Sequence, residues 1–169
     1  MLYHARSTPE ERAVRRRVRG RHTDFGTISL LFRQPVAGLQ VRMRDDSWRW
    51  VKPYPASITV NIADALQFWS AGYLRSSVHR VVAPPPDQYG LDRLGLLYFV
   101  RPAHDLDLRT LDSPLLRRLG LLDDEARDQA AGITAGDWVK ARVREDVQEA
   151  VEGGHKIVPV LGGLKTRYY

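Results

Sequence analysis

Apolar and polar residues alternate over short stretches between Thr27 and Val100, and glycine, proline and aspartate residues interrupt them. β-Branched and aromatic side chains bounded by such turn residues are typical of β-strands. The pattern predicts strands at residues 27–32, 39–43, 48–52, 57–62, 77–82 and 94–100, with a further candidate at 105–108. Because no long helix separates these strands, we expect antiparallel pairing and therefore a barrel or a sandwich.

Three consecutive prolines follow Ala83, and a helical pattern begins after residue 108. The prolines remove three backbone donors in a row and predict a loop at 83–86. Ser113 with Pro114 suits the cap and first turn of one helix, and Thr134 suits the cap of another. Apolar residues recur along the second helix at helical spacing, and we expect them to pack against the sheet: Val139, Val143, Val147, Ala150 and Val151.

The composition is that of an ordinary globular domain, with 169 residues of which 43% are hydrophobic and 27% charged. The chain contains no cysteine, which excludes disulfides, thiolate catalysis and cysteine-ligated metal sites. No apolar run reaches the roughly 18 to 20 residues of a membrane span, and the N-terminus lacks the pattern of a secretory signal. We therefore expect a cytoplasmic protein that does not bind membranes.

The net charge is +6, and basic residues cluster near the N-terminus. Such a cluster can attract phosphates. Arginine is in excess along the whole chain, however, so we expect a solvated surface segment rather than a nucleic-acid site. The cluster comprises Arg12, Arg15, Arg16, Arg17, Arg19 and Arg21.

The most specific chemistry is an imidazole and carboxylate pair followed by a distant imidazole. His22 and Asp24 stand two residues apart, and on an extended chain such side chains project to the same face. His79 lies in the predicted strand 77–82. If that strand lies beside the one that begins after Asp24, the three side chains converge. Two imidazoles and one carboxylate on one side of a metal leave the other side open, as oxygen-activating non-haem Fe(II) sites require.

These ligand types also suit zinc, manganese and cobalt, so the ligand types by themselves do not select the metal. Three protein ligands exclude a closed structural zinc site unless His4, His104 or His155 joins them. A zinc hydrolase remains an alternative, although no obvious general base accompanies the three ligands.

Arg93 follows His79 after the proline loop, at the start of the next predicted strand. A hairpin would bring it back toward the metal. A guanidinium is always charged and holds a carboxylate with two parallel hydrogen bonds, so Arg93 suits the far end of a dicarboxylic cosubstrate. The alternative for a single arginine is a surface ion pair.

Five segments together resemble the isopenicillin N synthase-like 2-oxoglutarate/Fe(II) oxygenases. They occur in the order and spacing of that family, over about residues 20–102: His-Thr-Asp-Phe-Gly at 22–26, Gly-Leu-Gln-Val at 38–41, Val-Asn-Ile-Ala-Asp at 60–64, Ser-Val-His-Arg-Val at 77–81 and Arg-Leu-Gly at 93–95. The resemblance implies a mainly β protein, a double-stranded β-helix (jelly roll) with C-terminal helices. It also implies Fe(II) bound by His22, Asp24 and His79, and 2-oxoglutarate reaching Arg93.

The activity that the resemblance implies is oxidation of a small organic substrate by O2, in a hydroxylation, desaturation or cyclisation, with succinate and CO2 released from 2-oxoglutarate. Phe25, Trp69 and Tyr98 are candidates for lining the substrate side, with plain core packing as the alternative. For Gly38, and for Asn61 with Asp64, we expect turn-forming roles. A further expectation concerns Gly95, which replaces the serine of the family's Arg-x-Ser motif. Because glycine lacks the serine hydroxyl, we expect 2-oxoglutarate to bind roughly 1.5 to 3 kcal/mol more weakly than in members that carry the serine, unless a water molecule replaces the hydroxyl.

Members of the family carry a substantial N-terminal region that buttresses the barrel. Here only residues 1–5 correspond to its early barrel strand, with Tyr3 in place of a tyrosine near the cosubstrate, so we expect a barrel without that buttress. We divide the chain into a basic segment at 1–19, an oxygenase core at 20–108 and a helical extension at 109–169. A missing N-terminal half or a partner protein would supply the buttress of the barrel. The alternative function is a truncated, non-catalytic remnant or an interaction module of the same family.

Overall fold

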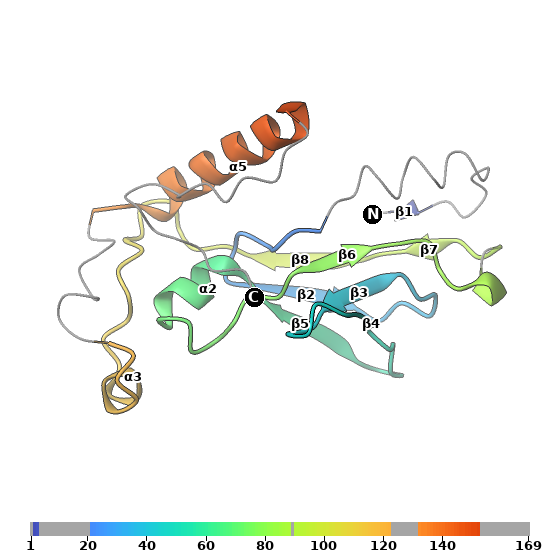
Figure 1. Ribbon diagram of the computed structural model, residues 1–169, viewed down its shortest axis with the longest axis horizontal. Helices are drawn as coiled ribbons and strands as arrows, with labels where there is room; N and C mark the ends of the chain where they lie inside the picture. Colours follow the sequence, from blue (N-terminus) through green and yellow to red (C-terminus); the bar gives the residue numbers. More distant parts are fainter. Residues whose placement is uncertain (1, 4–20, 89, 123–131, 153–169) are drawn as a thin grey trace.

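The computed structural model of the protein describes residues 2–3, 21–88, 90–122 and 132–152 (Figure 1). Its strands form three antiparallel sheets. Antiparallel pairing follows from the short connections between strands, because a parallel crossover needs a dozen residues or more. The prediction of a mainly β protein with antiparallel pairing is confirmed.

The first sheet has the order β5-β2-β8, with β2 (Ile28–Phe32) between β5 (Ile58–Ile62) and β8 (Leu97–Val100). Ser29 of β2 stands opposite Asn61 on one side and Phe99 on the other. Because side chains alternate along a strand, these three residues share one face of the sheet.

The second sheet has the order β4-β3-β6, with β3 (Leu39–Arg42) between β4 (Trp48–Trp50) and β6 (His79–Val81). In a third, two-stranded sheet, β1 (Leu2–Tyr3) pairs with β7 (Arg93–Leu94), so the predicted early strand at residues 1–5 is present. A cleft lies between the larger sheets, because residues of β2, β3 and β5 line it together.

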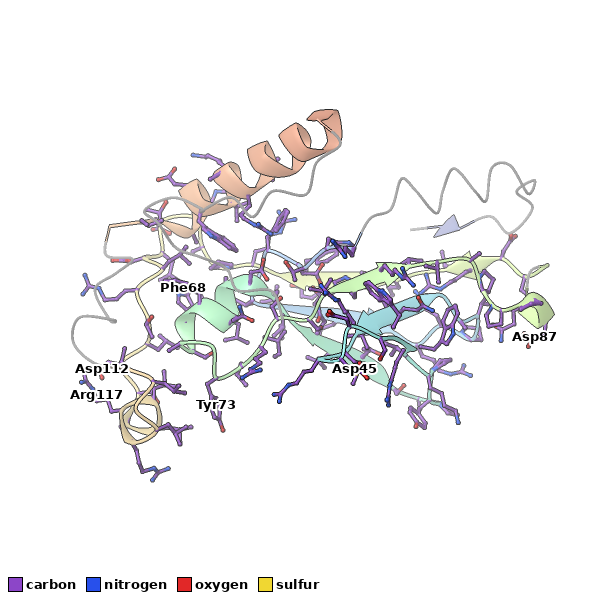
Figure 2. All side chains as sticks on the ribbon, in the orientation of Figure 1. Asp45, Phe68, Tyr73, Asp87, Asp112 and Arg117 are labelled. Atoms are coloured by element: carbon purple, nitrogen blue, oxygen red, sulfur yellow. The ribbon has the colours of Figure 1, made fainter. Side chains whose placement is uncertain are left out.

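Four helical segments complete the described structure. They are α2 (Asp64–Trp69), the 3₁₀ turn η1 (Pro86–Gln88), α3 (Pro114–Arg118) and α5 (Ala135–Glu152). Ser113 and Pro114 begin α3 as predicted, and an exposed Arg117–Asp112 ion pair of 2.7 Å lies beside it (Figure 2). Thr134 caps α5, since its Oγ1 accepts the backbone N–H of Asp137 at 3.2 Å.

The main hydrophobic cluster lies at one end of the sheets, where α2 meets the first turns of α5. Its buried members are Ala65, Leu108, Ala135 and Trp138, and Phe25, Phe68, Trp69, Ile133 and Val139 pack against them. The long helix is therefore held by its N-terminal part. In Figure 1, the remainder of α5 extends away from that cluster.

Two expectations about α5 and α2 need correction. The buried apolar residues of α5 pack in a cluster with α2, Leu108 and Phe25 rather than on a sheet, and Val143 is 46% exposed. The side chains of Val147, Ala150 and Val151 lie outside the described residues. Helix α2 itself was missed, because six residues are too short to show a helical period.

The strand predictions agree with the structure except near Arg93 and Leu108. The expected strand at 94–100 is divided into β7 and β8. The candidate at 105–108 forms no strand and contributes only a bridge between Asp107 and Thr134. The proline loop is present, with Pro86 beginning the short turn η1.

Gly26 is required where the chain enters β2. A Cβ atom there would overlap the carbonyl oxygen of Val100, which also accepts the backbone N–H of Thr27 at 2.9 Å. We expect Gly26→Ala to destabilise the fold by about 1 to 3 kcal/mol, because backbone must shift to admit the methyl group. Chemical denaturation measures this loss. Gly90→Ala is the matched control, since a Cβ at Gly90 meets nothing within 4 Å; equal stability of the two variants would contradict the prediction.

Candidate metal centre

A backbone bridge brings the two predicted histidines together. The N–H of His22 donates to the carbonyl of His79 at 3.1 Å, and the N–H of His79 donates to the carbonyl of His22 at 2.9 Å. The segment before Asp24 therefore pairs with β6. The strand after Asp24, β2, does not lie beside β6 but pairs with β5 and β8, so the ligands converge without the strand pairing considered from the sequence.

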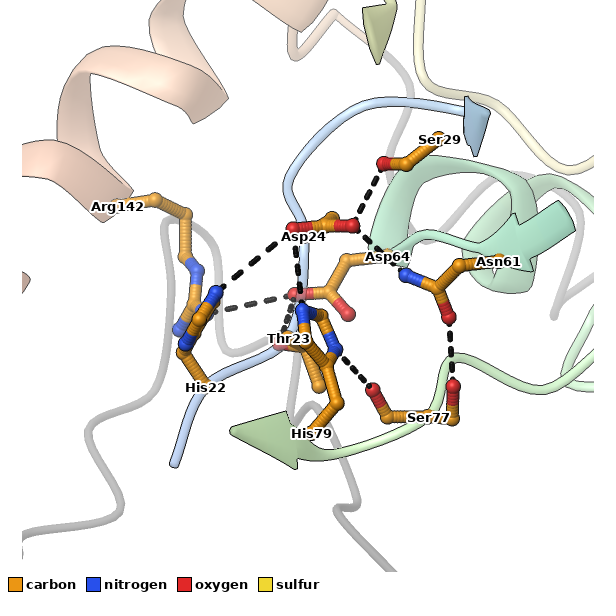
Figure 3. A network of polar contacts seen from close by, with 9 residues as sticks. All are labelled: His22, Thr23, Asp24, Ser29, Asn61, Asp64, Ser77, His79 and Arg142. Atoms are coloured by element: carbon orange, nitrogen blue, oxygen red, sulfur yellow. Dashed lines mark hydrogen bonds and ion pairs between the residues drawn. The ribbon is translucent and has the colours of Figure 1, made fainter. Parts of the chain in front are cut away.

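The three predicted ligands converge at this bridge (Figure 3). Asp24 Oδ1 lies 3.9 Å from His22 Nε2 and 3.7 Å from His79 Nε2. One ligand atom from each residue lies within 4.8 Å of the other two, and the imidazole centroids are 4.5 Å apart. His22 has a side chain that is 55% exposed, whereas that of His79 is 15% exposed. The group is thus open to solvent on one side.

The carboxylate of Asp24 is held by hydrogen bonds to one of its two oxygens. Asp24 Oδ2 accepts the hydroxyl of Ser29 at 2.6 Å and the amide of Asn61 at 2.7 Å. The other oxygen, Oδ1, is the one that faces both imidazoles. This arrangement presents a single carboxylate oxygen to a metal.

The ring of His79 is oriented by the residues just before its strand β6. Its Nδ1 lies 3.0 Å from the carbonyl oxygen of Ser77, which accepts a hydrogen bond and so places the proton on Nδ1. The lone pair then resides on Nε2, the atom that faces Asp24. Burial lowers the pKa of His79, which keeps the imidazole neutral near pH 7 and therefore able to bind a metal.

Asn61 connects two of the candidate ligands. Its amide nitrogen donates to Asp24, and its amide oxygen accepts the hydroxyl of Ser77 at 2.6 Å. Because the carbonyl of Ser77 orients His79, one chain of polar contacts runs from one ligand to the other. Asn61 lies in β5, not in the turn that the sequence suggested, and its position opposite Ser29 became evident only from the strand register.

Asp64 lies behind residues 22–25, the segment that carries His22 and Asp24 and is called the ligand segment below. It is 2% exposed. Its Oδ2 accepts the hydroxyl of Thr23 at 2.8 Å and lies 3.4 Å from Arg142 Nη2. Its backbone N–H donates to the carbonyl of Asp24 at 2.9 Å. Burial raises the pKa of Asp64, while the hydroxyl groups of Ser76 and Thr23 and the charge of Arg142 lower it. The expectation of a turn was wrong here too, since Asp64 begins α2.

Arg93 is 8% exposed, so a surface ion pair is not its role. Its Nε donates to the carbonyl of Val36 at 3.3 Å, and its side chain lines the cleft together with Leu31, Leu39 and Thr59. Gly38 makes room for it, because a Cβ at Gly38 would lie 2.8 Å from Arg93 Nε. That close approach, rather than a turn, explains the glycine.

Arg93 reaches the cleft by a different route from the one predicted. Its strand β7 pairs with β1 and not with β6 in a hairpin. Val82, the residue after β6, donates its N–H to the carbonyl of Gly38 at 2.9 Å. Since Val82 is three residues beyond His79, this end of the cleft lies roughly 10 Å along the strand from the histidine.

The aromatic candidates for the substrate side are placed differently. Phe25 and Trp69 pack against the hydrophobic cluster. Tyr98 stands opposite Leu30 and so points away from the face that carries Ser29, whereas its neighbour Phe99 shares that face. His104 is exposed and lies outside the ligand group, while His4 and His155 lie outside the described residues, as do all the clustered arginines except Arg21.

The donor set fits a divalent transition metal. Two neutral imidazole nitrogens and one carboxylate oxygen are borderline to hard donors, and a facial set of this kind leaves coordination positions open. The fixed proton on His79 and the hydrogen-bonded oxygen of Asp24 are outer contacts of the sort that orient metal ligands.

Comparison with known proteins agrees with this geometry. Residues 3–102 match the model of the 2OG-Fe(II) oxygenase superfamily. A 2-oxoglutarate-dependent dioxygenase of Aspergillus fumigatus is 31% identical over 135 residues, which cover 69% of this chain and 34% of that protein. A proline hydroxylase of Petromyces alliaceus is 43% identical over 102 residues, which cover 57% of this chain and 31% of that protein.

Solved structures show the same likeness. A 2OG-Fe(II) oxygenase family protein from Caulobacter crescentus has a TM-score of 0.68 at 32% identity, covering 86% of this chain and 44% of that one. A full-length Neurospora crassa protein, solved in complex with alpha-KG and thymine, has a TM-score of 0.64 at 30% identity, covering 76% of this chain and 37% of that one. The predicted double-stranded β-helix is confirmed.

The chain spans about a third of the length of the curated relatives it matches. Across the described residues, no helix combines the length and apolar character needed to cross a membrane. The resemblance found in the sequence, with Fe(II) and 2-oxoglutarate as the cofactor and cosubstrate of the family, is confirmed at the level of the superfamily. The match over residues 3–102, the relatives and the shared fold show that the chain belongs to the 2OG-Fe(II) oxygenase superfamily.

Proposed function

We propose that this protein is an oxidoreductase that uses Fe(II), 2-oxoglutarate and O2 to oxidise a small organic substrate, with succinate and CO2 as co-products. The observation that carries the proposal is the convergence of His22, Asp24 and His79 within 4.8 Å of one another. The buried cation Arg93, in the cleft beside Gly38, supports the same proposal.

In this proposal, the Nε2 atoms of both histidines and Oδ1 of Asp24 hold the iron. Bound iron supplies the activation of O2 and of the keto acid. The protein residues keep the ligands in position: Ser29 and Asn61 restrain the carboxylate, and the carbonyl of Ser77 restrains the imidazole of His79. Ligands fixed in this way need little rearrangement when the metal binds.

Arg93 would bind the distal carboxylate of 2-oxoglutarate. Its side chain is buried against Gly38, so the guanidinium is desolvated and strengthens its attraction for an anion. Leu31 and Thr59 on one wall and Leu39 and Val51 on the other give the cleft apolar surface around that charge. A five-carbon dicarboxylate, with the bonds at its two ends, matches the roughly 10 Å between His79 and the Gly38 end of the cleft.

We further propose that the substrate is a small molecule rather than a nucleic acid, and that the protein acts in the cytoplasm without a membrane partner. The absence of cysteine is compatible with a reducing compartment. The division into segments 1–19, 20–108 and 109–169 belongs to the same proposal. The alternative, a non-catalytic remnant or an interaction module, is separated from an enzyme by oxygen-dependent formation of succinate.

Replacing His79 by alanine tests the metal ligands. Anaerobic addition of Fe(II) and 2-oxoglutarate to the wild-type protein is expected to produce a metal-to-ligand charge-transfer band, and His79→Ala is expected to lose it because one of three ligands is gone. His104→Ala is the matched control, since His104 is exposed and lies outside the ligand group. A band of wild-type strength in His79→Ala would remove this histidine from the site.

Replacing Arg93 by methionine tests the cosubstrate site. The variant keeps most of the aliphatic stem but loses the charge, so the KM for 2-oxoglutarate is expected to rise roughly ten- to a hundredfold, with a much smaller change in kcat at saturation. Succinate formation measures both constants. Arg44→Met, at an exposed position in the turn after β3, should leave both unchanged. An unaltered KM in Arg93→Met would refute the assignment.

A further inference from the structure

We propose that Arg142 of α5 is a positioning residue for the metal centre, which it serves by pairing with buried Asp64 and so fixing the segment that carries His22 and Asp24. The inference rests on the proposed function, because it assigns a role toward the same metal site. Figure 3 shows Arg142 reaching from α5 to Asp64 beside the three candidate ligands. Arg142 lies outside residues 3–102, which match the family model.

Asp64 holds the ligand segment at two points. The hydroxyl of Thr23, the residue between His22 and Asp24, donates to its carboxylate at 2.8 Å. Its backbone N–H donates to the carbonyl of Asp24 at 2.9 Å. A shift of Asp64 would therefore move the residues on which the metal site depends.

The carboxylate of Asp64 needs a nearby cation to occupy this position. The side chain is 1% exposed, and a buried carboxylate without a partner is strongly destabilising. Arg142 is itself well buried, with 11% of its side chain exposed. The ion pair therefore gives the buried carboxylate of Asp64 a positively charged partner beside the segment that carries Asp24.

Arg142 also contacts the ligand segment directly, at Phe25. Its guanidinium carbon lies 5.4 Å from the centroid of Phe25, the residue after Asp24, at a distance typical of a cation–π contact. Phe25 packs in turn against the cluster that holds Ala135 and Trp138 of α5. Helix α5 therefore contacts the ligand segment through the guanidinium of Arg142 and through apolar side chains.

Several contacts hold the part of α5 that leads to Arg142. Thr134 caps its first turn, and Gly136 lies close to His104, since a Cβ there would be 3.0 Å from the His104 carbonyl oxygen. Trp138 is 5% exposed. Arg142 is four residues beyond Trp138 and so lies on the same face of the helix. Lys140 instead extends into solvent, with a side chain that is 70% exposed.

The test uses Arg142→Met, which keeps an unbranched stem without the charge, and Lys140→Met as the matched control on the same helix. Two quantities are measured in the full chain: Co(II) affinity by anaerobic titration with the metal alone, and amide hydrogen exchange of the peptide covering residues 22–27. Arg142→Met is expected to weaken Co(II) binding by about 10- to 100-fold, the range for residues that orient metal ligands, and to accelerate exchange in this peptide. Lys140→Met should change neither.

Thr23→Val provides a second test that leaves the ion pair intact. It removes the hydroxyl through which Asp64 holds the segment, in a side chain of similar shape, and is expected to lower Co(II) affinity and accelerate the same exchange. Unchanged exchange of residues 22–27 in either variant overturns the proposal, as does an equal effect of Lys140→Met. If the wild-type protein binds no Co(II), the proposed function fails instead, and the exchange measurements still decide the role of Arg142.

Discussion

The backbone bridge between His22 and His79 is the contact on which the rest of the site depends. These residues are far apart in the sequence, yet their N–H and carbonyl groups exchange two hydrogen bonds, which fixes the distance between the imidazoles. Asp24 then needs to be only two residues beyond His22 to place its carboxylate between them. Backbone pairing, and not any side-chain attraction, thus assembles a group of three donors that have little reason to associate without a metal.

A network of polar contacts turns this proximity into a defined ligand geometry. One oxygen of Asp24 is engaged by Ser29 and Asn61, which leaves the other oxygen facing the histidines. Asn61 continues through Ser77 to the backbone that orients His79. Such networks in a poorly hydrated interior are costly when only partly satisfied and rigid when complete. The sheet containing β2 and β5 therefore supplies the orientation of the ligands, while β6 supplies the second imidazole.

The helical elements join this site to the hydrophobic cluster. Helix α2 begins at Asp64, whose backbone and carboxylate both contact the ligand segment, and it continues into Ala65, Phe68 and Trp69 of the cluster. Helix α5 packs on the same cluster and extends Arg142 to Asp64. In the cleft, Gly38 and Arg93 pack closely against each other, so the packing of Gly38 fixes the side chain of Arg93 as α5 fixes that of Arg142. Both charged side chains are held by the packing of elements distant from them in the sequence.

The alternation of residues in the sequence determined most of the strands, and proline and the capping residues Ser113 and Thr134 determined where loops and helices begin, because these signals are local. The motif residues also indicated the candidate ligand set His22, Asp24 and His79 and the anion-binding character of Arg93. Only the tertiary structure decided which strands are neighbours, that Asn61 and Asp64 support the candidate ligands rather than form a turn, and that Arg142 reaches the site. Those outcomes depend on strand register and on contacts between distant segments, which no local spacing encodes.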